Sequence, residues 1–130
     1  MKSYRKNLGE WGERVAAQYL EQHGYHILEF NVFTPFGELD LVAQQTVGAP
    51  DKGAAINAIV FFEVKTRTST AYGLPEEAVT SRKQQHLLSA AQDYLQKHPE
   101  LSGDWRIDVI AVQREPGKMP TITHFENAVT

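Results

Sequence analysis

The segment IVFFEVKTR, residues 59–67, constrains the fold of this chain more than any other segment. Its first four residues are apolar, which is typical of a strand buried in a sheet. Glu63 and Lys65 then follow where the strand should still be packing, and residues two apart in a strand point to the same face. The segment therefore predicts a buried strand that surfaces beside an acid and a base.

The Glu-x-Lys spacing is not specific by itself, because it arises by chance in roughly one chain in two of this length. A solvated strand face explains it equally simply. Asp40 adds weight, since it lies in the otherwise apolar part of GELDLVA, residues 37–43. The turn TPFG predicts that this strand pairs antiparallel with residues 25–33. If it also pairs antiparallel with residues 59–67, Asp40 and Glu63 converge.

Two converging carboxylates repel each other unless a cation lies between them, and Mg²⁺ is a natural candidate because it prefers oxygen ligands. The alternative for Asp40 is an exposed strand residue or an acid that caps the turn. A third acid, Glu13, lies at the margin of the apolar face of a helix predicted for residues 8–23, which Gly24 ends. Glu13 could lean over the sheet, or form a rim ion pair with a neighbouring base.

A second helix is predicted from the capping box SRKQ, with Ser81 as N-cap and Gln84 at N3, to the His98-Pro99 pair. Lys83 heads its apolar face. This lysine could cover the core with its stem, or bind phosphate near the helix N-terminus.

The element order α-β-β-β-α-β-β predicts one α/β domain over residues 1–130, with helices on a central mixed sheet. The last two strands are residues 105–112 and a short one near residues 121–125. Residues 44–57 and 68–80 are predicted to be irregular. Arg106 and Asp108 alternate on the first of those strands, and we expect a structural ion pair there.

Composition excludes several classes of function. The chain has no cysteine, so thiolate metal sites and disulfides are absent, and its five histidines show no zinc-enzyme spacing. A net charge of −3 argues against a protein that coats nucleic acid, although a local basic site is still allowed. No secretory signal or membrane-length apolar run is present, so we expect a cytoplasmic protein without a membrane partner.

Most of the chain, residues 9–112, then resembles a known group of proteins. GELDLVA and FFEVKTR resemble the Asp…Glu-x-Lys core of the PD-(D/E)xK nuclease superfamily, which has the restriction-endonuclease-like fold. The order of GEWGERVAAQYLEQHGYHILEFN, these two motifs, GLPEEAVTSRKQQHLLSAAQDYL and RIDVIAV more closely resembles the YraN-like family of predicted endonucleases. That family is similar to archaeal Holliday-junction resolvases.

The resemblance implies a role for each site residue. Asp40, Glu63, the main-chain carbonyl of Val64 and, directly or through water, Glu13 would hold Mg²⁺ or Mn²⁺. Lys65 would orient or help deprotonate the attacking water. One departure is Leu39, which stands before Asp40 where the superfamily often has proline.

The implied partner is DNA in a branched or structured form. Backbone contacts would come from basic residues near the site and near the N-terminus: Arg67, Arg82, Lys83, Lys2, Arg5 and Lys6. Resolvase-like relatives are often dimers, so a homodimer is compatible with the resemblance. Two alternatives are a catalytically silent nucleic-acid-binding module of the same fold and a protein-interaction domain whose Glu-x-Lys pair faces solvent.

Overall fold

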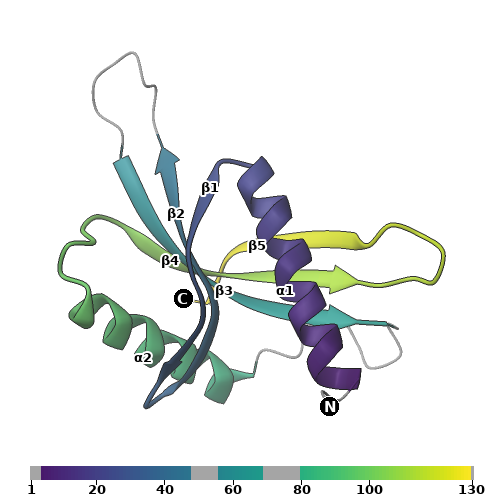
Figure 1. Ribbon diagram of the computed structural model, residues 1–130. Coiled ribbons are helices and arrows are strands. Elements are labelled where there is room, and N and C mark those ends of the chain that lie inside the picture. Colours follow the sequence, from purple (N-terminus) through teal and green to yellow (C-terminus); the bar gives the residue numbers. More distant parts are fainter. Residues whose placement is uncertain (1–3, 48–55, 69–79, 130) are drawn as a thin grey trace.

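The computed structural model describes residues 4–47, 56–68 and 80–129, and these ranges contain two helices and five strands (Figure 1). Their order is the predicted α-β-β-β-α-β-β, and the predicted single α/β domain with a mixed sheet is confirmed. The elements are α1 (Tyr4–Gln22), β1 (Tyr25–Thr34), β2 (Gly37–Val47), β3 (Ile56–Arg67), α2 (Ser81–Lys97), β4 (Trp105–Gln113) and β5 (Thr121–Val129).

The strands lie side by side in chain order, from β1 to β5. All neighbours are antiparallel except β3 and β4, which are parallel. A parallel pair needs a crossover connection, and α2 lies in it. The turn between β1 and β2 is the predicted one: the Thr34 hydroxyl donates to the carbonyl of Gly37 at 2.7 Å and accepts the Phe36 amide at 3.1 Å.

The two helices cover opposite faces of the sheet. On one face, Ala16 and Leu20 of α1 pack with Phe62 of β3, and on the other, Leu87 of α2 packs with Phe61. The apolar run of β3 is therefore buried on both faces, as its sequence predicts. In the described part of the chain, neither helix combines the length and the apolar character needed to cross a membrane.

Helix α1 begins one turn before the predicted start at residue 8. The prediction began at residue 8 because the apolar stripe starts there and the preceding turn is mostly polar. It ends at Gln22, and Gly24 follows with φ of +88°, which confirms the expected glycine at the helix end.

The predicted capping box of α2 is wrong by one residue. Thr80, with φ −68° and ψ 165°, is the N-cap, and its hydroxyl accepts the Lys83 amide at 3.2 Å. Thr80 and Ser81 both carry a hydroxyl, so the extended backbone at Thr80 decides which one caps. The predicted end is confirmed, since α2 stops at Lys97 with His98 as C-cap.

The loop predicted for residues 44–57 is too long at both ends. Strand β2 continues to Val47 and β3 starts at Ile56, because these two residues are register partners in the antiparallel ladder. Residues 48–55, and residues 69–79 of the other predicted irregular segment, lie outside the described residues. Strand β5 also runs further than predicted, to Val129.

Candidate functional site

The candidate site lies where β2 and β3 separate. Their pairing runs from Val47↔Ile56 to Leu41↔Phe62, and the next pair in the same register would be Asp40 and Glu63. There the ladder ends, and the Asp40 carboxylate Oδ2 accepts the Val64 amide N–H at 2.8 Å. The predicted convergence of Asp40 and Glu63 is thus present, and a side-chain hydrogen bond fixes Asp40 at the fork.

Strand β2 twists strongly at this point. Leu41 packs in the α1 cluster, whereas Leu39 packs in the α2 cluster. Residues two apart in a flat strand share one face, so the strand must rotate about its own axis between these two leucines. Asp40 lies at the centre of this rotation.

A close approach of α1 to β3 brings Glu13 to the same place. A Cβ atom added at Gly12 would lie 2.9 Å from both Cβ and Cγ2 of Thr66, and closer still to its hydroxyl. Only glycine therefore allows the helix to lie this near the strand. Glu13 is the next residue and is half-buried, so it leans over the sheet.

Among the described residues, one group of acids could hold a metal ion: Glu13, Glu38 and Asp40. One carboxylate oxygen from each lies within 4.8 Å of the others. Glu38 was missed in the sequence analysis. Its signal was present, because Glu38 lies two residues before Asp40 in the same predicted strand.

The electrostatics of this group indicate a shortage of positive charge. Burial, and then the charge of Glu63, raise the pKa of Asp40 to about 8, against the lowering effect of the Val64 hydrogen bond. Burial also raises the pKa of Glu13, although hydrogen bonding by Asn31 opposes it. Clustered carboxylates that raise one another's pKa fit a hard divalent cation such as Mg²⁺ or Mn²⁺.

Two lysines form the basic side of the site. Oε1 of the buried Glu63 lies 3.1 Å from Lys65 Nζ and 3.3 Å from Lys83 Nζ. Lys65 comes from the same strand and Lys83 from the first turn of α2. Glu63 therefore already has two cationic partners, whereas Glu13, Glu38 and Asp40 form a separate acidic group.

The sequence matches the model of the uncharacterised protein family UPF0102 over residues 12–112, which include every acid of the site. The chain belongs to this family. The resemblance to the YraN-like family is confirmed, since UPF0102 is that family.

Relatives in UPF0102 match nearly the whole chain. A UPF0102 protein of Syntrophomonas wolfei is 46% identical over 123 residues, covering 95% of this chain and 97% of the relative. One of Geobacter metallireducens is 44% identical over 128 residues, covering 98% and 96%. The family match thus extends over the folded domain.

The other described basic residues that were expected to contact DNA lie on the same helices and strand as the site residues. Arg82 is exposed beside Lys83 in the first turn of α2. Arg67 is half-buried at the end of β3, where its carbonyl accepts the Arg114 amide at 2.8 Å. Lys6 is exposed near the start of α1. The side chains of Lys2 and Arg5 lie outside the described residues.

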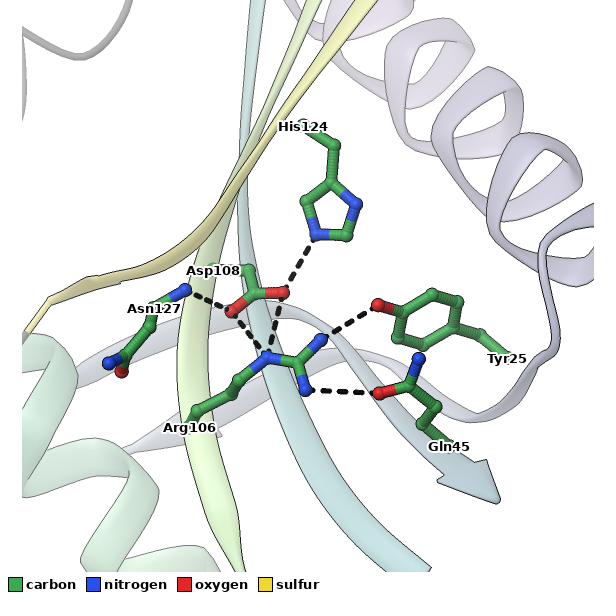
Figure 2. A network of polar contacts seen from close by, with 6 residues as sticks. All are labelled: Tyr25, Gln45, Arg106, Asp108, His124 and Asn127. Carbon is green, nitrogen blue, oxygen red and sulfur yellow. Dashed lines mark hydrogen bonds and ion pairs between the residues drawn. The ribbon is translucent and has the colours of Figure 1, made fainter. Parts of the chain in front are cut away.

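A second polar network crosses the sheet away from these acids, and Figure 2 shows its six residues. The fully buried Asp108 accepts Nε of Arg106 at 3.0 Å, the Asn127 amide at 2.8 Å and Nε2 of His124 at 2.7 Å. The Arg106 guanidinium also donates to Gln45 at 3.0 Å and Tyr25 at 2.7 Å. The expected structural ion pair is confirmed.

This network is structural rather than reactive. Arg106 of β4 reaches past β3 to bind Gln45 of β2 and Tyr25 of β1. Within the described residues, no buried side-chain nitrogen or oxygen lacks a hydrogen-bond partner. The charged side chains of the network hydrogen-bond to partners within it, and these bonds join β1, β2, β4 and β5.

Proposed function

We propose that this protein is a metal-dependent nuclease that hydrolyses DNA phosphodiester bonds, with branched or junction-containing DNA as substrate. The observation that carries the proposal is the group Glu13, Glu38 and Asp40, whose oxygens lie within 4.8 Å of one another at the fork of β2 and β3. The ammonium group of Lys65 lies on the adjoining strand, in the Glu-x-Lys motif of the superfamily that the chain resembles.

The carboxylates of Glu13, Glu38 and Asp40 would hold Mg²⁺ or Mn²⁺, with Glu63 and the carbonyl of Val64 as the further ligands that the resemblance implies. When bound, the ion would lower the pKa of a water and neutralise charge on the phosphate. The Val64 amide keeps Asp40 in place by occupying one side of Oδ2. Gly12 keeps Glu13 close enough to take part.

The lysines would act on water and phosphate. Lys65, whose Nζ lies 3.1 Å from Glu63, would orient an attacking water. Lys83 comes from the N-terminal turn of α2, where free amides and the helix dipole already favour anions. Lys83 and the exposed Arg82 would therefore bind the DNA backbone next to the reacting phosphate.

The decisive experiment is a cleavage panel on linear, nicked, flapped and four-way DNA with Mg²⁺ or Mn²⁺. We expect cleavage of a branched substrate that is lost in Asp40→Asn and reduced at least a hundredfold in Glu13→Gln and Lys65→Met. Glu21→Gln is the matched control, since Glu21 is an exposed acid on the same helix as Glu13. Wild-type protein that cuts no substrate with either metal would refute the proposal.

Metal binding is measured separately by calorimetric titration with Mn²⁺. The carboxylate group predicts one saturable site that Asp40→Asn abolishes and Glu38→Gln weakens at least tenfold. Glu63→Gln tests the ligand set that the resemblance implies. If Glu38→Gln binds Mn²⁺ like wild type and Glu63→Gln does not, the ion is held by Asp40 and Glu63 without Glu38.

A second candidate function is nucleic-acid binding without hydrolysis. The observation that favours it is the pair of lysines on Glu63, because both ammonium groups contact Oε1 and weaken the attraction of this acid for a metal ion. Binding of branched DNA without cleavage, together with no saturable Mn²⁺ site, would select this alternative.

A further inference from the structure

Aromatic side chains project from the hairpin of β1 and β2. Among the described residues, four large apolar side chains are exposed, and three of them are phenylalanines of this hairpin: Phe30 (47% exposed), Phe33 (79%) and Phe36 (49%). The fourth is Met119, in the connection between β4 and β5. Burial in the core does not explain why this hairpin carries three aromatic residues.

The exposure of Phe33 does not come from a loose hairpin. Val32 and Leu39 are register partners, and both pack against the α2 cluster. The Thr34 hydroxyl holds the turn, and a Cβ atom added at Gly37 would lie 4.0 Å from Cβ of His86 in α2. One side of the hairpin is therefore anchored on α2, and Phe33, the next residue in β1, is displayed on the other side.

Phe33 is displayed beside the carboxylates. It is the register partner of Glu38, and directly opposite residues of an antiparallel pair share a face with Cβ atoms about 5 Å apart. Glu38 belongs with Glu13 and Asp40 to the group that could hold a metal ion. The aromatic ring therefore borders the candidate site.

We propose that Phe33 is a stacking platform for an unpaired base of the DNA strand whose phosphate occupies the carboxylate site. This inference rests on the proposed function and narrows its substrate class to DNA with unpaired nucleotides next to the cleaved bond.

Charge decides which part of the DNA can lie over Phe33. The three neighbouring carboxylates would take up a phosphate only through the metal ion that they hold, and they repel any other phosphate on the hairpin side. The face of a base is uncharged and stacks on an aromatic ring whatever its sequence. The cations lie on the other side of the site, where Lys65 and Lys83 contact Glu63. The backbone is thus directed toward α2 and the base toward the hairpin.

Base pairing decides which DNA can use this platform. Bases of an intact duplex are stacked on their neighbours, so only a flap, a gap or a branch point offers a free face without first breaking pairs. The platform therefore favours such DNA over a blunt duplex.

The test compares a fluorescent duplex carrying a single-stranded flap with a blunt duplex of the same paired sequence, in Ca²⁺ so that binding is measured without cleavage. Phe33→Ala should raise the Kd for the flapped DNA by between about fivefold and a hundredfold, and that for the blunt duplex less than twofold. Phe33→Trp, which keeps an aromatic face, should bind like wild type. Met119→Ala is the matched control for lost exposed apolar surface, and should change neither Kd.

Equal effects of Phe33→Ala on both DNAs, or no effect on either, would overturn the proposal. It is also overturned if sedimentation velocity shows a wild-type dimer that Phe33→Ala dissociates while flap binding is retained, because the hairpin would then be covered by a second copy. Failure of the nuclease proposal looks different: flap selectivity that depends on Phe33 persists while no DNA is cut.

Discussion

Replacing Gly12 by alanine tests how the site is assembled. The added Cβ would lie 2.9 Å from two carbons of Thr66 and closer to its hydroxyl, whereas ordinary contact begins near 3.4 Å. Helix α1 and strand β3 must then separate by more than 0.5 Å (3.4 − 2.9) at this crossing. Thr66 is β-branched, so its side chain cannot easily rotate out of the way.

The expected cost has two parts. Overpacking of this kind costs about 1–3 kcal/mol, and the better helix propensity of alanine returns about 1 kcal/mol, so we expect a net loss of about 1 kcal/mol in unfolding free energy. The effect on function should be much larger. Ligands of a reactive site must be held within about 0.5 Å, and a 1 Å misplacement can cost about a hundredfold in rate. A shift of α1 away from β3 would move Glu13 relative to Glu38 and Asp40.

Urea denaturation and Mn²⁺ titration measure the two effects. Gly9→Ala is the matched control, since it makes the same substitution in the same helix with no atom within 4 Å of the added Cβ. It should stabilise the protein by up to about 1 kcal/mol and leave Mn²⁺ binding unchanged. The double variant Gly12→Ala/Thr66→Ala should recover part of both losses, because it removes the hydroxyl that lies nearest.

Equal stability of Gly12→Ala and Gly9→Ala would show that the close approach of α1 to Thr66 does not limit the side chain at residue 12. A Gly12→Ala protein that loses stability but binds Mn²⁺ and cuts DNA like wild type would show that the position of Glu13 does not matter.

Two further predictions concern stability. Burial raises the pKa of Asp108, but hydrogen bonds, that from His124 first, outweigh it and hold this pKa below its ordinary value of 3.8. The ionised carboxylate therefore stabilises the fold above about pH 4, and the contribution is lost as the pH falls further. Asp108→Asn should cost about 3 kcal/mol in urea denaturation at pH 7 and less at pH 3, while the exposed control variant Asp104→Asn should cost under about 0.5 kcal/mol; a pH-independent difference contradicts this. Thr80→Ala should lose about 1 kcal/mol in the same assay and Ser81→Ala much less, and the reverse order would restore the cap expected from the sequence.

Local patterns predicted much of the fold. The apolar run of residues 59–62, the stripe along α1 and the turn at residues 34–37 each reflect the environment of one element, so they can be recognised without its neighbours. The same holds for the polar interruptions at Asp40, Glu63 and Lys65. Element ends were less predictable, because the cap at Thr80 and the ladder beyond Gln44 depend on backbone angles and on partners elsewhere in the chain.

The sequence by itself determined which elements form and which charges interrupt their apolar faces, since both follow from spacing along the chain. Only the tertiary structure decided how those charges are shared. The close approach of α1 to β3 brings Glu13 to Glu38 and Asp40, and Lys83, twenty residues from Glu63, pairs with it from the first turn of α2. Such contacts depend on how closely each helix approaches the sheet. The order of residues along any one element does not encode that approach.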